Sequence, residues 1–175
     1  YKNFNNNFIK ILLIYFFSTI IVIVLYRTAN IRLFDAFNLA FTTISSGGFI
    51  PTNSLSSILN NNLQIFVVSI SLLFPIFNFY LFFNIFTKQF KLRNHQEDLH
   101  LAVVIIILTL ILYFFIIPNE KFADLFLAII SSIATSGITT YSSNFDTSLF
   151  FILLTIIGGS LISTSSGVKY IRFYI

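Results

Sequence analysis

The sequence predicts an all-α integral membrane protein, and its composition and apolar runs carry this prediction. Of its 175 residues, 57% are hydrophobic and only 9% are charged, whereas a soluble domain has about 25% charged residues. Three apolar runs lie at residues 8–26, 63–87 and 99–117. A helix of about 19 residues is roughly 28 Å long, which matches the hydrocarbon core of a bilayer. No alternating pattern typical of a membrane barrel is present, so we expect helices in a lipid bilayer.

The basic residues set the expected orientation and exclude a nucleic-acid partner. The net charge is +4, but the ten basic residues are spread between apolar segments and form no basic stripe. If residues 88–98 are cytoplasmic, seven basic residues lie on or near that side: Lys2, Lys10, Lys88, Lys91, Arg93, Lys169 and Arg172. Arg27, Arg32 and Lys121 then lie outside, which satisfies the positive-inside rule.

Two further apolar segments are too short to span. Residues 33–45 and 122–134 each form about 20 Å of helix, and small hydroxylated residues and Gly follow at once. This pattern is typical of re-entrant segments that return to the side they entered from. A last apolar run meets Gly158-Gly159 before it crosses, so we predict an interrupted helix over 146–175.

An internal repeat links these segments. An offset of 89 residues places LFDAFNLAFTTISSGGF (33–49) on FADLFLAIISSIATSGI (122–138), and aligns Asp35 with Asp124 and Gly48 with Gly137. The flanking apolar runs keep the same order. We therefore predict two units, 1–94 and 95–175, each with a spanning helix, a short re-entrant helix, a small-residue loop and a second spanning helix.

This unit is the architecture of a cation-channel pore. A dehydrated cation needs dense, neutral oxygen ligands, which backbone carbonyls supply. Gly tolerates the backbone shapes that point successive carbonyls inward, and Ser or Thr adds hydroxyl oxygens. The short helix ends at the loop, so its partly negative end favours a cation. We expect Asp35 and Asp124, near the other ends, to cap exposed N–H groups rather than to contact ions.

At this point two stretches resemble a known family. FDAFNLAFTTISSGGF is similar to the pore helix and filter of the Trk/Ktr/HKT potassium transporter superfamily. IGGSLISTSSGVKYIR is similar to its later signature, roughly GG-x3-ST-x2-G-x-K-x2-R. The resemblance covers nearly the whole chain and is nearest to the bacterial Trk membrane subunit, which has four pore units. The chain resembles its second unit and most of its third.

The resemblance implies roles for particular residues. Potassium would be bound by the backbone carbonyls of two filter strands, Ser46, Gly47, Gly48 and Phe49, and Thr135, Ser136, Gly137 and Ile138. A loop from 158 to 167 would act as an intramembrane gate, with fixed signature positions at Gly158, Gly159, Ser163, Thr164, Gly167, Lys169 and Arg172. The sequence departs from the family at Ile138, where Phe is usual, and at Leu161, Ile162, Ser165 and Ser166, where small residues or Gly are common.

The resemblance also implies partners and location. These are the missing pore units, a homodimer of the full protein, a cytoplasmic nucleotide-binding regulatory subunit, and a bacterial plasma membrane. Potassium would be the substrate, and no cofactor is expected on this chain. No nucleophile–base set or phosphate-binding loop is present, so we do not expect an enzyme. His95 and His100 have no further ligands nearby in sequence, so we expect no metal site there.

Several alternatives stay open at this stage. Gly47-Gly48 could be a tight turn between helices, and Gly158-Gly159 could be a helix-packing site. Pro75 and Asn78 could kink the second spanning helix or form an irregular turn at the pore. Lys169 and Arg172 could be cytoplasmic anchors or could hold the gate. The whole chain could be a non-conducting remnant or structural fragment, or a two-pore channel that dimerises.

Overall fold

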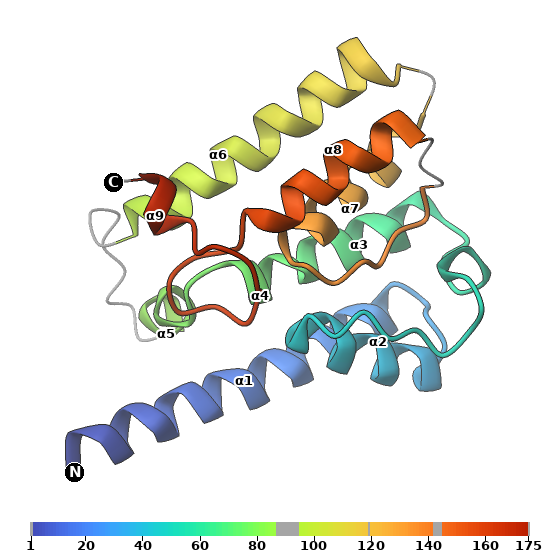
Figure 1. Cartoon of the computed structure of the whole chain (residues 1–175). Helices are drawn as coiled ribbons and strands as arrows, with labels where there is room; N and C mark the ends of the chain where they lie inside the picture. The colour runs from blue at the N-terminus through green and yellow to red at the C-terminus, as the bar shows by residue number, and fades with distance from the viewer. Residues whose placement is uncertain (1, 87–94, 119, 142–144, 175) are drawn as a thin grey trace.

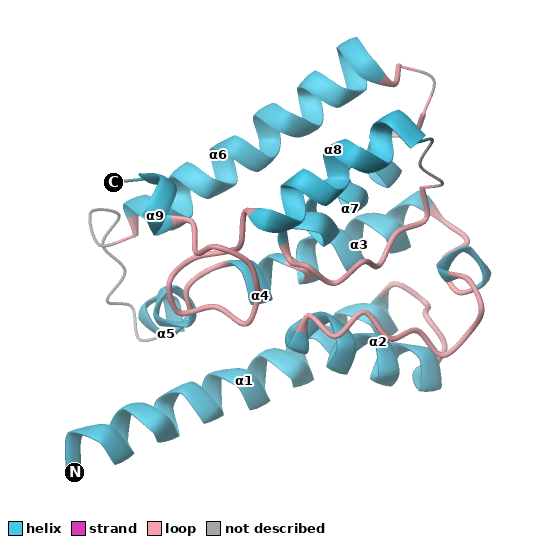
Figure 2. Cartoon of the chain, viewed as in Figure 1, coloured by secondary structure: helices cyan, strands magenta, loops and turns pink. Residues whose placement is uncertain are grey.

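The computed structural model describes residues 2–86, 95–118, 120–141 and 145–174, and its described part is helical (Figures 1 and 2). Lys88, Lys91 and Arg93, which contribute to the expected orientation, lie outside the described residues, as does the predicted boundary at residue 94. At one end of the molecule lie the start of α1, α5 and α9, and at the other lies the α1–α2 connection (Figure 1).

The first unit begins with two helices of very different length. Helix α1 spans Lys2–Thr28 and is followed by the short α2, Leu33–Ser45, which packs against it. A short 3-10 turn, Leu55–Ser57, then leads to α3, Asn62–Ser71. The α1–α2 pair is further joined to α3 by the buried Tyr26 hydroxyl, which is hydrogen-bonded to Ser71 Oγ and Thr43 Oγ1.

The second predicted spanning helix, 63–87, is not continuous. It consists of α3, α4 (Leu73–Ile76) and α5 (Phe79–Phe86), and the axis bends by 105° between Ile76 and Phe79. The interruption lies at the position of Pro75 and Asn78, where the sequence left open a kink or an irregular turn. The break includes Phe77, whose backbone is extended, and Asn78, whose side chain caps the next helix by accepting from the Tyr80 N–H at 2.9 Å.

The second unit repeats this order. Helix α6 spans Gln96–Ile111 and continues into a π-helical turn, Leu112–Ile116. The short α7, Phe122–Ile133, packs against α8, Phe145–Ile156, and against α3 of the first unit. After α8 the chain loops through 157–170 before the last turn, α9, Ile171–Tyr174.

One apolar core joins the two units. It includes Val22, Leu39 and Ile44 from the first unit and Leu101, Leu127, Ile129 and Ile133 from the second. Large apolar side chains also cover the outer faces, among them Phe8, Leu12, Phe16 and Val24 on α1, and Ile106, Ile107 and Leu110 on α6. Phe8–Thr28 and Gln96–Ile116 are long and apolar enough to cross a membrane, and the bent α3–α5 segment makes a third span if counted as one. The chain therefore has the fold of a helical membrane protein.

Candidate functional site

Both short helices end in the same backbone geometry. Ser46 and Thr135, 89 residues apart, have left-handed φ angles of 55° and 57°. Two residues further on, Gly48 and Gly137 have φ angles of 73° and 67°. Left-handed backbone is costly for residues that carry a Cβ, so its recurrence at aligned positions marks a shared structural device.

The hydrogen bonds at these helix ends also match. The Gly47 N–H donates to the Thr42 carbonyl at 2.9 Å, and the Ser136 N–H donates to the Ser131 carbonyl at 3.0 Å. The side chains then differ between the units. Thr42 Oγ1 accepts from the Phe49 N–H at 2.7 Å, whereas Ser131 Oγ and Ser136 Oγ lie 3.1 Å apart in a hydrogen bond. The two segments 46–49 and 135–138, predicted as filter strands, therefore leave their helices in one conformation.

The two filter strands touch each other. A Cβ built on Gly48 would lie 2.1 Å from the Ser136 carbonyl oxygen, so only Gly fits there. The last residues of the strands differ in environment, because Phe49 is 82% exposed whereas Ile138 is buried. Within the described part of the chain, no donor is hydrogen-bonded to a carbonyl oxygen of residues 46–49 or 135–138.

We call the loop 157–170 the gate loop, after the role predicted for it. Hydrogen bonds join its two ends. The Gly158 N–H donates to the Val168 carbonyl, the Val168 N–H donates to the Ile156 carbonyl, and both distances are 2.9 Å. The Tyr170 N–H donates to the Gly159 carbonyl at 3.0 Å. These bonds hold together the two ends of the chain where α8 is interrupted.

The gate loop contacts the ends of both short helices. Thr164 Oγ1 donates to the Ile44 carbonyl in the last turn of α2 at 2.8 Å. Ser166 donates to Thr135 Oγ1 with its N–H at 3.1 Å and its hydroxyl at 2.8 Å. The loop is therefore hydrogen-bonded to the last turn of α2 in the first unit and to Thr135 at the end of α7 in the second.

Lys169 binds inside this loop rather than in solvent. Its ammonium donates to the Ser163 carbonyl and to Ser163 Oγ at 3.1 Å each, and to the Ser165 carbonyl at 2.7 Å. Ser163 Oγ also donates to the Ser160 carbonyl at 2.6 Å, and Ser165 Oγ accepts from the Gly159 N–H at 2.8 Å. Lys169 is thus bonded to Ser163 and Ser165 of its own loop, and its role as a gate residue stays a prediction.

Backbone groups freed by the bend in α3–α5 bind the gate loop. The Ile76 carbonyl accepts from the Ser160 N–H at 2.8 Å, and the Pro75 carbonyl accepts from the Ser165 N–H at 3.1 Å. In the other direction, the Phe79 N–H donates to the Ile162 carbonyl at 2.9 Å. A Cβ on Gly159 would lie 2.3 Å from the Ile76 oxygen, so this approach also needs Gly.

The sequence did not lead us to expect this contact between the two interrupted helices, although each interruption has its own signal. Pro75 and Asn78 indicated a disturbed helix, and Gly158-Gly159 indicated another. Unsatisfied backbone groups at membrane depth must find partners in protein. Applied to both interruptions together, that rule predicts that the free backbone groups of one interrupted helix bond to those of the other.

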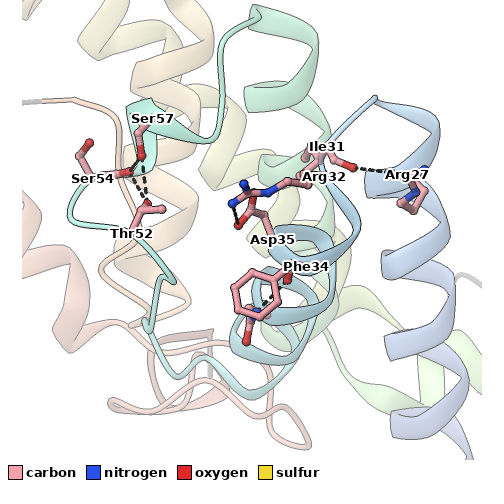
Figure 3. A network of polar contacts seen from close by, with 9 residues as sticks. Arg27, Ile31, Arg32, Phe34, Asp35, Thr52, Ser54 and Ser57 are labelled. Atoms are coloured by element: carbon pink, nitrogen blue, oxygen red, sulfur yellow. Dashed lines mark hydrogen bonds and ion pairs between the residues drawn. The ribbon is translucent and has the colours of Figure 1, made fainter.

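The opposite ends of the short helices carry the aligned acids. Asp35 is buried and accepts from Arg32 through both oxygens, at 2.9 and 3.1 Å, as Figure 3 shows. Hydrogen bonding to Asp35, followed by attraction to its charge, raises the pKa of Arg32. Asp124 accepts from Thr140 Oγ1. The expected hydrogen-bonded cap is wrong for α2 and α7, since neither helix has a side-chain cap bond; both acids lie instead in the first turn, where the helix dipole favours them.

Two cavities adjoin these elements. A polar cavity of about 270 Å³ lies at the outer end of α2 and is lined by Arg32, Asp35, Thr52 and Gln64. A larger cavity of about 480 Å³ lies beside the second filter strand and is lined by Thr135, Gly137, Thr155 and Ser166. Among the described residues, no group of three His, Cys, Asp or Glu side chains is arranged to hold a metal ion.

Comparison with solved structures gives a clear match. The crystal structure of the potassium transporter TrkH from Vibrio parahaemolyticus superposes with a TM-score of 0.79 over 89% of this chain and 36% of that chain, at 24% identity. The chain has the fold of this part of TrkH. No family model matches the chain.

A relative found by sequence also matches nearly the whole chain. A curated protein of Methanocaldococcus jannaschii, named as an uncharacterized cation transporter, is 28% identical over 168 residues, which is 94% of this chain and 34% of that protein. The chain therefore spans about a third of the length of this relative and of TrkH.

Proposed function

We propose that the chain supplies two pore units of a four-unit, Trk-type potassium uptake protein of the plasma membrane. The observation that carries this proposal is the pair of filter strands, which are alike in backbone and in mutual contact, together with one loop that is bonded to the last turn of α2 and to Thr135 of the second strand. The named functions of TrkH and of the cation transporter relative support it, as does the third of their length that the chain covers.

The filter chemistry follows from the carbonyl groups. The oxygens of residues 46–49 and 135–138 are free of hydrogen bonds from the described residues and can replace the water around a potassium ion. Ser46 Oγ is buried and has no hydrogen-bond partner among the described residues, and it lies where α2 ends, so it offers one more oxygen. Helices α2 and α7 end at the first and second filter strands, so the negative ends of their dipoles favour a cation there.

The gate loop supplies control. We take as the closed position the one in which Thr164 is bonded to the end of α2 and Ser166 to Thr135. Its outward or sideways displacement would open the path from the filter to the cytoplasm. Two further pore units would complete the ring of carbonyls, and the exposed Phe49 and the cavity beside Gly137 are surfaces that these units would cover.

A dimer of the complete protein and a cytoplasmic nucleotide-binding regulator complete the proposal. Both come from the resemblance to Trk-type transporters. Nothing in the proposed filter chemistry depends on them, so they are tested separately, by cross-linking and by co-purification of the complete protein.

Rubidium uptake tests the function. The chain is expressed in cells that lack their own potassium uptake systems, alone and joined to two further Trk-type pore units, and each form is compared with its Gly48→Asp variant. We expect uptake by the joined form and its loss in the variant. Uptake by the chain alone would mean that two copies form a pore. Absence of uptake in both forms, despite membrane insertion, would support the alternative of a non-conducting remnant.

A further inference from the structure

One buried carboxylate lies between the two interrupted helices. Asp98, in the first turn of α6, is 3% exposed. Its Oδ1 accepts from the hydroxyl of Ser160 in the gate loop and, at 2.9 Å, from the N–H of Asn78 in the bend. Its Oδ2 lies 3.3 Å from His95 Nδ1. One side chain is thus bonded to both interruptions.

The neighbouring acid strengthens this connection. Glu97 Oε1 accepts from the Leu161 N–H at 3.1 Å, directly after Ser160. The first turn of α6 therefore holds two consecutive residues of the gate loop by two consecutive carboxylates. Acids in a first helical turn also offset the helix dipole, but that role needs no burial and no partner in another unit.

Burial makes the Asp98 contact specific. A carboxylate withdrawn from water needs hydrogen-bond donors around it, and loss of one donor leaves a poorly paired charge. Ser160 is fully buried, and its own N–H donates to the Ile76 carbonyl at 2.8 Å. Ser160 is therefore bonded to α6 through its hydroxyl and to the bend through its backbone N–H.

We propose that Asp98 is a positioning residue that fixes the gate loop against the bend in α3–α5. A shift of the first turn of α6 then moves the loop and the bend together. The inference rests on the proposed function for its physiological meaning, since it couples the first turn of α6 directly to the gate loop.

Thiol labelling tests the contact without requiring ion transport. The chain has no Cys, so Leu161→Cys places a single thiol at a half-exposed loop position. The purified chain in lipid nanodiscs is labelled with a water-soluble maleimide, with and without Ser160→Ala. Ser69→Ala is the matched control, because Ser69 is also buried and donates to Ile65 of its own helix.

We expect Ser160→Ala to accelerate labelling about twofold, because position 161 is already half-exposed and loss of a hydrogen bond to a charged group frees the rest of it. Asp98→Asn, which keeps the shape and removes the charge, should accelerate it as well, and Ser69→Ala should not. Equal rates in Ser160→Ala and Ser69→Ala would overturn the proposal. So would equal acceleration at Val68→Cys, a fully buried reporter on α3, because that result would indicate general loosening.

Uptake by the joined four-unit form adds a functional readout. Loosening of the gate should raise the maximal rate of rubidium uptake in Ser160→Ala and leave its KM unchanged, since the filter is intact. A changed KM with an unchanged maximal rate would contradict a role in positioning the gate. If labelling changes as expected but the joined form never transports rubidium, the Asp98 contact is supported and only the proposed function is refuted.

Discussion

Gly48 lies against the carbonyl oxygen of Ser136, so closely that a Cβ on Gly48 would come within 2.1 Å of it. The two filter strands therefore meet backbone to backbone. Gly137, at the aligned position, has a similar φ angle but no atom within 4 Å of its own Cβ position. Substitutions at Gly48 and Gly137 therefore allow the effect of steric contact to be measured apart from that of backbone strain.

Gly48→Ala should therefore be far more harmful than Gly137→Ala. Both variants bear left-handed strain of about 1 kcal/mol, but only Gly48→Ala adds overpacking, worth about 1–3 kcal/mol more. Thermal unfolding in detergent, followed by rubidium uptake in the joined form, measures the difference. Equal loss of stability in the two variants would show that strand contact is unimportant.

Ser166→Ala should loosen the gate loop beneath the second filter strand. It removes the hydroxyl that donates to Thr135 Oγ1 and leaves the backbone donor in place. Loss of a neutral hydrogen bond of about 1 kcal/mol should raise uptake severalfold if the loop limits it. Thr28→Ala is the control, because that exposed hydroxyl donates within its own helix. A fall in uptake would mean that Ser166 helps conduction rather than closure.

Lys169→Met should release the gate loop more strongly. The ammonium donates to three oxygens of Ser163 and Ser165, and hydrogen bonds from a charged donor contribute about 1.5–3 kcal/mol each. Methionine keeps the apolar length of the side chain and leaves those oxygens unbonded. Hydrogen exchange of the amides of residues 158–168 should become faster, whereas exchange in α7 should not. Unchanged exchange in the loop would return Lys169 to the role of a simple cytoplasmic anchor.

Tyr26→Phe should destabilise the first unit without altering the filter. The buried hydroxyl joins Ser71 and Thr43, so its removal should lower the free energy of unfolding by about 1–2 kcal/mol. Tyr113→Phe, whose ring packs edge-on against Phe114 and Phe122, is the aromatic control. Equal melting temperatures for the two variants would contradict this assignment.

The two short helices could be predicted because their bounds depend on local signals. Leu33–Ser45 is an apolar stretch that ends where Ser46 and Gly48 adopt positive φ angles, and the same pattern recurs 89 residues later. Composition and hydropathy sufficed for the membrane fold. The departures at Ser165 and Ser166 were also visible, and the structure gives these hydroxyls hydrogen bonds that Gly could not make.

The rest depends on contacts between distant residues. Asp35 was expected to cap backbone N–H groups, yet Arg32, three residues earlier, takes both of its oxygens. Asp98 reads in sequence as an ordinary first-turn acid, since nothing local shows that Ser160, 62 positions later, will reach it. Pro75 and Asn78 indicated a disturbed helix but not a bend of 105°, because the backbone groups at the bend are bonded to the distant gate loop.

The exchange of hydrogen bonds between the bend and the gate loop has a consequence for how the protein is made. When residues 62–86 first enter the membrane, the partners of Pro75, Ile76 and Phe79 have not yet been synthesised. These backbone groups cannot stay unbonded in hydrocarbon, so the early segment must insert as a straighter helix or remain partly hydrated. The bend is completed only when residues 160–165 arrive. Maturation of the first unit thus waits for translation of the second, and a chain cut short before the gate loop should be recognised and degraded as unfinished.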